Sequence, residues 1–124
     1  MPDTGLKAFA RIAFACAIAL TSSGAALAHA ALHHANPEAG STVSDPPHEV
    51  TLTFTDTLEP AFSSAEVTDS SGTRVDEGKS QVNGDVIRIG LKTLSPGSYR
   101  VHWRAVSVDT HRSEGNFTFS VSGQ

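Results

Sequence analysis

Residues 49–56 read Glu-Val-Thr-Leu-Thr-Phe-Thr-Asp, and this stretch decides the fold. Val50, Leu52 and Phe54 alternate with threonines, so the three apolar side chains point to one face of an extended chain. A period of two residues predicts a β-strand with one buried face and one exposed face. The chain is therefore expected to contain a sheet that covers a hydrophobic core on one side only.

Further short strands are expected over 64–68, 85–89, 98–107 and 116–120, separated by turn residues. Asn83-Gly84 is a strong hairpin signal just before one of them. Outside residues 49–56, the side chains expected in the core are Phe62, Ile87, Ile89, Leu91, Tyr99, Val101, Trp103, Phe117, Phe119 and Val121. Regular strand spacing and the lack of a helical period after residue 28 predict an all-β fold, a small antiparallel sandwich or barrel.

The first 28 residues have the pattern of a signal peptide. Lys7 and Arg11 precede a nine-residue apolar run over 12–20, and small residues follow up to Ala26-Leu-Ala28. The run is far shorter than the roughly 20 residues that span a bilayer, which disfavours a retained membrane helix. We expect cleavage after Ala28, export to the periplasm, and one mature domain over 29–124 with no membrane insertion of its own.

The composition of the mature part limits its partners and its metal chemistry. Lys7, Arg11 and Asp3 belong to the leader, which leaves seven basic and twelve acidic side chains in 29–124. This acidic balance argues against nucleic acid or an anionic membrane as a partner. The single cysteine, Cys16, lies in the leader, and Met1 is the only methionine, so the mature part has no sulfur ligand for a soft metal such as Cu(I).

Cleavage after Ala28 would make His29 the first residue of the mature protein. A terminal histidine offers two nitrogen donors, its free α-amine and its imidazole, which together chelate one metal ion. Asp109 and His111 lie two residues apart between the last two expected strands, and this spacing lets a carboxylate and an imidazole face one point. Taken alone, an Asp-x-His pair is more often a hydrogen-bonded turn. Together with His29 it forms a nitrogen and oxygen donor set suited to Cu(II).

Several motifs over almost the whole mature chain resemble those of the CopC family of periplasmic copper-binding proteins. They are His29-Ala-Ala-Leu32, Pro37-Glu-Ala-Gly40-Ser, Pro96-Gly-Ser-Tyr99, Trp103-Arg-Ala-Val-Ser107-Val-Asp109-Thr-His111 and Gly115-Asn-Phe117. The resemblance implies an immunoglobulin-like β-sandwich or Greek-key barrel of about seven strands. It also implies one Cu(II) per chain, bound by His29, Asp109 and His111, and a non-enzymatic carrier role in copper resistance or homeostasis, with a possible CopD-type inner-membrane partner.

This chain departs from part of the family pattern. Some members carry a methionine-rich loop for a second, Cu(I) site, and the mature part of this chain has no methionine. His33, His34 and Glu114 are further potential ligands, although solvated roles are more typical of such positions.

Two functions from other classes are also compatible with this sequence. A copper held by an N-terminal histidine and a second imidazole is also the centre of lytic polysaccharide monooxygenases, but 96 residues leave little room for a substrate-binding plane. A metal-free immunoglobulin-like adhesion or spacer module is the other alternative, and cleavage at a different bond would favour it.

Overall fold

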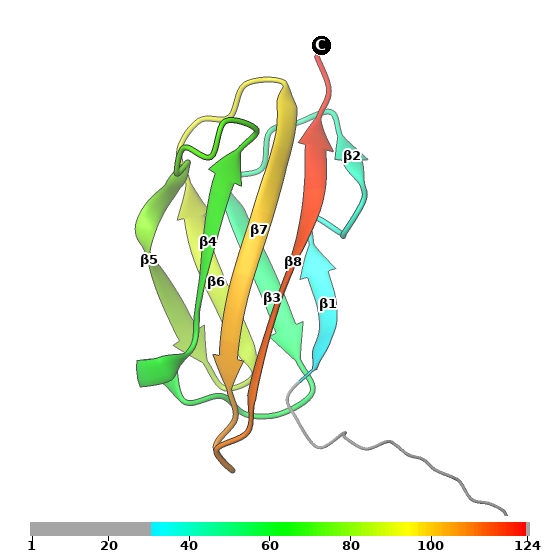
Figure 1. Ribbon diagram of the computed structural model, residues 1–124. Coiled ribbons are helices and arrows are strands. Elements are labelled where there is room, and N and C mark those ends of the chain that lie inside the picture. Colours follow the sequence, from blue (N-terminus) through cyan, green and yellow to red (C-terminus); the bar gives the residue numbers. More distant parts are fainter. Residues whose placement is uncertain (1–30, 124) are drawn as a thin grey trace, which may run out of the picture.

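The computed structural model describes residues 31–123, which form two sheets packed face to face (Figure 1). The expected signal peptide and His29 lie outside the described residues. The elements are β1 (Leu32–Asn36), β2 (Thr42–Val43), β3 (Glu49–Phe54), the 3-10 turn η1 (Pro60–Phe62), β4 (Ser64–Asp69), β5 (Asp76–Asn83), β6 (Val86–Leu91), β7 (Gly97–Val106) and β8 (Arg112–Val121). No helical segment within residues 31–123 has the length and apolar character of a membrane span.

The strand order is β1-β3-β6-β5 in one sheet and β2-β8-β7-β4 in the other. All neighbouring strands pair antiparallel except β2, which pairs parallel with β8. The predicted all-β sandwich is confirmed, with eight strands because the two-residue β2 adds to the seven longer ones. The hairpin predicted at Asn83-Gly84 joins β5 to β6, and Gly84 takes the left-handed φ of 65° that this turn requires.

The alternation over 49–56 has the predicted structural result. Val50, Leu52 and Phe54 are at most 2% exposed, whereas the threonines between them are only partly buried. Near the start of β7, the buried Tyr99 donates a hydrogen bond from its hydroxyl to the carbonyl of Ser95. A tyrosine that bonds back to the backbone just before its own strand is a recurring feature of immunoglobulin-like sandwiches.

Trp103, on β7, packs both against the core and against the neighbouring strand β8. Its ring meets Phe54 of the opposite sheet edge-on, with ring centroids 5.0 Å apart. On β8 the partner of Trp103 is Gly115, where a Cβ atom would lie only 2.7 Å from the indole ring. The Trp…Gly part of the sequence motif therefore has a packing reason, since the indole fills the space that a side chain at Gly115 would need.

One prediction for the core is wrong. Phe62 is 64% exposed, because it belongs to the 3-10 turn that begins at Pro60 and not to a strand with an inward face. Phe117 is partly buried and packs against the core, and Phe54 and Phe119 are buried as predicted. β8 also begins at Arg112, four residues before the predicted start.

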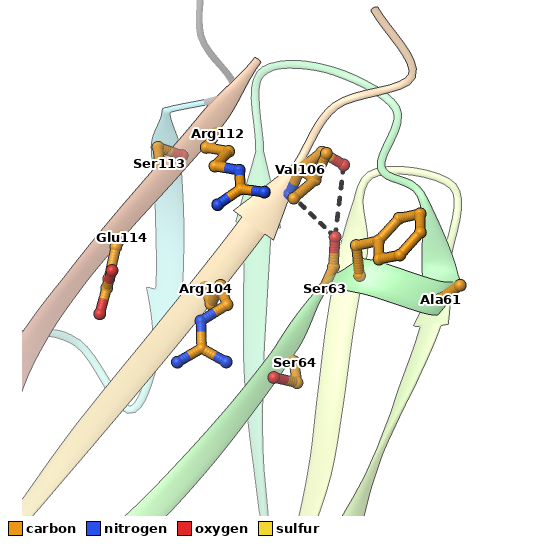
Figure 2. Close-up of a pocket in the computed structure, with 9 residues that line it drawn as sticks. Ala61, Ser63, Ser64, Arg104, Val106, Arg112, Ser113 and Glu114 are labelled. Carbon is orange, nitrogen blue, oxygen red and sulfur yellow. Dashed lines mark hydrogen bonds between the residues drawn. The ribbon is translucent and has the colours of Figure 1, made fainter. Parts of the chain in front are cut away.

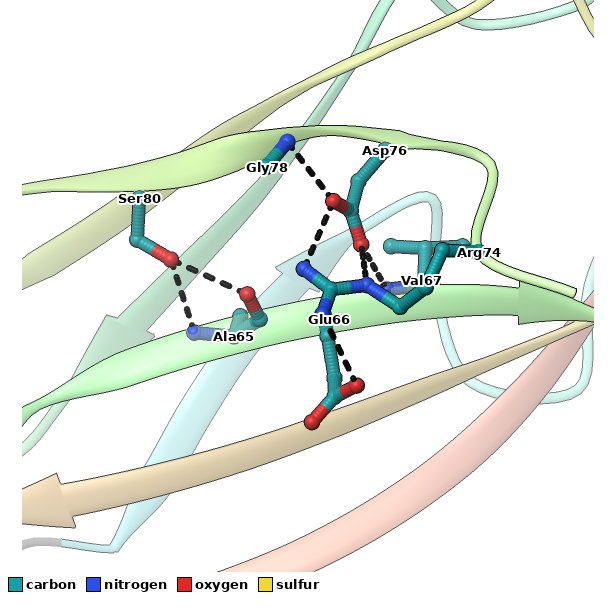
Figure 3. A network of polar contacts seen from close by, with 7 residues as sticks. All are labelled: Ala65, Glu66, Val67, Arg74, Asp76, Gly78 and Ser80. Atoms are coloured by element: carbon teal, nitrogen blue, oxygen red, sulfur yellow. Dashed lines mark hydrogen bonds and ion pairs between the residues drawn. The ribbon is translucent and has the colours of Figure 1, made fainter.

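Side chains of β5 connect it to β4 across the edge where the two sheets meet (Figure 3). Asp76, whose side chain is fully buried, accepts hydrogen bonds from the backbone N–H groups of Val67 at 2.7 Å and Gly78 at 2.8 Å. Arg74 donates to the same carboxylate from Nε at 2.9 Å and from Nη2 at 2.8 Å. Further along, the Ser80 hydroxyl accepts from the Ala65 N–H and donates to the Ala65 carbonyl. These polar side chains substitute for a backbone ladder between β4 and β5.

Candidate metal site

The loop between β7 and β8 holds the two predicted ligands that lie within the described residues. The Ser107 N–H donates to the His111 carbonyl at 2.9 Å, and the Thr110 N–H donates to the Ser107 carbonyl at 2.8 Å. Thr110 has a φ of 75°, a left-handed conformation that is rare for a β-branched residue. The loop is therefore a tight turn that its own backbone bonds hold in shape.

Asp109 and His111 are brought together as the two-residue spacing predicts. Oδ1 of Asp109 lies 3.1 Å from Nδ1 of His111, and both side chains are about half exposed, at 58% and 47%. The Ser107 hydroxyl, which is fully buried, donates to the same carboxylate oxygen. These hydrogen bonds, first that from Ser107 and then that from His111, hold the pKa of Asp109 below its usual value. The carboxylate is thus ionised at neutral pH beside an imidazole, and both can be reached from solvent.

This pair supplies one oxygen and one nitrogen donor of the kind that binds Cu(II). Residues 31–123 contain no group of three or more His, Cys, Asp or Glu side chains that could hold a metal ion. The described residues therefore bring together two of the three predicted ligands, and the third, His29, lies outside them. The same contact is also the hydrogen-bonded turn that an isolated Asp-x-His pair would form.

One segment, residues 55–58, is hydrogen-bonded both to Ala31, where the described chain begins, and to the loop between β7 and β8. The Ala31 carbonyl accepts from the Thr55 N–H at 2.9 Å, and the Ala31 N–H donates to the Thr55 hydroxyl. Two residues later, the Thr57 carbonyl accepts from the Val108 N–H at 3.0 Å, and Leu58 bridges to Ser107. Ala31 and the Asp109–His111 loop therefore lie at the same end of the sandwich (Figure 1).

The remaining candidate ligands have other surroundings. Glu114 pairs with His102 at 3.0 Å on the outer face of β7 and β8. His33 and His34 are both exposed, because a β-bulge between Leu32 and His34 breaks the simple alternation along β1. Ser107 belongs to the motif over 103–111 without a predicted role, although its spacing of two residues from Asp109 is the same signal that identified His111.

Comparisons with known proteins agree with this fold. Residues 32–122 match the family model described as the CopC domain. Copper resistance protein C of Xanthomonas campestris pv. juglandis is 37% identical, over 81% of this chain and 85% of that protein. The crystal structure of PcoC, a methionine-rich copper resistance protein from Escherichia coli, superposes with a TM-score of 0.68 at 35% identity, covering 77% of this chain and 100% of that one. Copper transport protein CutJ of Bacillus subtilis is 33% identical over 76% of this chain, but only 18% of that longer protein.

The fold and the loop define a small β-sandwich with a carboxylate and imidazole pair at one end. The chain belongs to the CopC family. Membership confirms the expected class, a copper resistance and transport protein and not an enzyme, and thereby decides against the monooxygenase and the metal-free module.

Proposed function

We propose that the mature protein is a periplasmic carrier that binds one Cu(II) through the α-amine and imidazole of His29, the carboxylate of Asp109 and the imidazole of His111. The observation that carries this proposal is the 3.1 Å contact between Asp109 and His111 at the sandwich end where the described chain begins. His29 precedes Ala31 by two residues, and two extended residues span up to about 7 Å. A mature N-terminus at His29 is therefore within reach of this end.

Export creates half of the proposed site. While residue 28 is still attached, the His29 nitrogen is an amide, which does not bind a metal unless it loses a proton. Cleavage after Ala28 turns it into an amine, whose ordinary pKa is roughly 7.7–8. Because the amine must be unprotonated to bind, copper affinity falls as the pH is lowered, and protons are released on binding. The precursor should thus bind copper weakly and the exported protein should bind it tightly.

The ligand types favour Cu(II) over Cu(I). PcoC is described as methionine-rich, whereas the only methionine of this chain is Met1, in the expected leader. Without a thioether or thiolate, the mature protein has no soft ligand for Cu(I). Reduction is therefore expected to release copper, and it offers a route for delivery to an acceptor.

A membrane protein of the CopD type is the partner we propose for this transfer. The similarity to CutJ supports it, since there the matched region is a small part of a longer copper transport protein. A domain that is covalently joined to a transport polypeptide in one protein can act beside a separate polypeptide in another.

The experiment that tests the site compares the mature protein starting at His29 with a variant that carries one extra alanine before it. Competition with a chelator measures Cu(II) affinity, and electron paramagnetic resonance reports the number of nitrogen ligands. We expect the extra residue to weaken binding by at least about a hundredfold, which corresponds to ~2.7 kcal/mol, and to remove one nitrogen from the spectrum. Equal affinity in the two forms would show that the amine is not a ligand.

A further inference from the structure

A pocket of about 490 Å³ lies beside the loop that carries Asp109 and His111. η1, the end of β7 and the start of β8 form its walls (Figure 2). The Ser63 hydroxyl accepts from the Val106 N–H at 3.0 Å and donates to the Val106 carbonyl, which fixes η1 against β7. Hydrogen bonds therefore hold the walls of the pocket together. Neither Asp109 nor His111 lines it.

Two arginines of the pocket have no acidic partner among the described residues. Arg104 faces Glu114 across the strands, and Arg112 faces Val106, so the two arginines occupy diagonal positions on the outer face of β7 and β8. Glu114 also lines the pocket, but its carboxylate pairs with His102 at 3.0 Å. By contrast, Arg88 pairs with Glu49 on the opposite sheet.

The same end of the sandwich exposes two large apolar side chains. Phe62 on the pocket wall is 64% exposed and Val108 in the loop is 54% exposed. Backbone bonds hold Phe62 in place, since its N–H donates to the Glu59 carbonyl and the Glu59 N–H donates to the Val106 carbonyl. Exposed aromatic and arginine side chains on a rigid support are the residue types that contribute most to protein–protein binding.

We propose that this pocket is a docking site for an extended acidic segment of a partner protein, with carboxylates at alternate positions and apolar side chains between them. Diagonal positions on neighbouring strands are about 7–8 Å apart. Side chains at alternate positions of an extended peptide are about 7 Å apart, so that two successive carboxylates match the two guanidiniums. Phe62, on the wall of the pocket, contacts the same segment beside the two carboxylates.

An anionic membrane fits this surface less well than an acidic peptide. Lipid-binding segments use clusters of four to eight Lys or Arg, whereas two arginines line this pocket and residues 29–124 carry a net negative charge. That the docked partner exchanges copper with the neighbouring loop rests on the proposed function. Docking itself does not depend on it.

The test uses a capped peptide of sequence Glu-Leu-Glu-Leu-Glu-Leu, titrated into the isotope-labelled mature protein and followed by NMR. We expect shifts at Phe62, Arg104 and Arg112, and at least a tenfold loss of affinity in the Arg104→Gln/Arg112→Gln double variant. Phe62→Ser should weaken binding severalfold, and added salt should weaken it further. Arg88→Gln, which removes one exposed arginine from the other sheet, should bind the peptide like the unchanged protein.

Several other results would contradict the proposal that this pocket is a docking site for an acidic peptide. Shifts away from the pocket, equal binding of a Gln-Leu-Gln-Leu-Gln-Leu peptide, or an unaffected double variant would each do so. Binding to phosphatidylglycerol vesicles without peptide binding would assign the surface to a membrane, and dimerisation lost in the double variant would assign it to a second copy. Copper affinity, measured on the same proteins, separates the two proposals, because it should change by less than about fivefold in the double variant while His111→Ala should leave peptide binding intact.

Discussion

Two aspartates with lowered pKa values, Asp76 and Asp109, lie in opposite kinds of surroundings. Asp76 is buried, and all its hydrogen bonds come from groups of β4, β5 and the segment just before β5 (Figure 3). Asp109 is 58% exposed in the β7–β8 loop and shares one oxygen between Ser107 and His111. A lowered carboxylate pKa therefore does not by itself mark a binding site. Exposure next to another potential ligand separates the second aspartate from the first.

The largest difference between the two regions should appear when His111 is replaced. In His111→Ala the proposed site loses an imidazole, and Cu(II) affinity should fall by orders of magnitude, at least about a hundredfold or ~2.7 kcal/mol. The side chain is 47% exposed, so the free energy of unfolding of the metal-free protein should change by less than about 0.5 kcal/mol. A chelator competition and a urea titration measure the two quantities. A change in affinity under about tenfold would contradict the ligand assignment.

Replacing Asp76 should have the reverse effect. Asp76→Asn keeps the shape but has one acceptor oxygen, so one of the backbone N–H groups of Val67 and Gly78 faces an amide donor. An unsatisfied buried group and a weakened bond to Arg74 together should lower the free energy of unfolding by about 2–3 kcal/mol. Cu(II) affinity at a temperature where the variant is folded should stay the same.

The control for this variant removes the other acidic partner of Arg74. Glu66 lies 3.4 Å from Nη1 of Arg74 and is 43% exposed, so Glu66→Gln should cost less than about 1 kcal/mol. Equal losses of stability in the two variants would show that burial of Asp76 is not the source of its effect.

Acid should weaken the two regions through different groups, the carboxylate of Asp76 for stability and the α-amine of His29 for copper binding. Burial acts to raise the pKa of Asp76, but the bonds from Arg74, Val67 and Gly78 outweigh it and keep the pKa below its usual value. A carboxyl whose pKa is lower in the folded state stabilises the protein above its unfolded pKa of about 3.9, and this stabilisation is lost as the pH falls through the folded value.

The free energy of unfolding should therefore decrease below about pH 4. Urea titrations between neutral pH and pH 2–3 measure it. The Asp76→Asn variant should show a shallower decrease than the unchanged protein, and an identical slope in both would contradict the assignment. Copper should be lost at a higher pH than stability, because the ordinary pKa of an α-amine lies well above that of a carboxyl group.

Local patterns were enough to predict most of the fold. The alternation over 49–56 and the turn at Asn83-Gly84 act through neighbouring residues, and both gave the observed strands. Features that depend on distant contacts were missed. The pairing of β2 with β8 joins residues far apart in sequence, and the exposure of Phe62 follows from how η1 is fixed to β7.

The candidate site likewise has a feature that the local sequence predicts and features that depend on distant contacts. The spacing of Asp109 and His111 predicts their contact, because residues two apart in an extended chain share a face. The buried hydroxyl of Ser107 and the need for Gly115 beneath Trp103 come from packing across β7 and β8, which a single sequence does not show.

The smallest effect is expected at Thr110, which closes the turn between Asp109 and His111. Its φ of 75° costs an L-amino acid roughly 1–2 kcal/mol, and a β-branched side chain adds to the strain. Thr110→Gly removes this strain but gives the unfolded chain more freedom, at a cost of about 0.5–1 kcal/mol. The net result should be a protein more stable by about 0.5–1 kcal/mol, with Cu(II) affinity changed by less than about threefold since neither ligand is altered. Urea titration and chelator competition measure both, with Gly84→Ala as the opposite control, because it introduces a side chain at a φ of 65° and should destabilise the protein. A less stable Thr110→Gly protein would mean that the Thr110 side chain, whose hydroxyl donates to the Asp109 carbonyl, contributes more to the loop than its strained backbone costs.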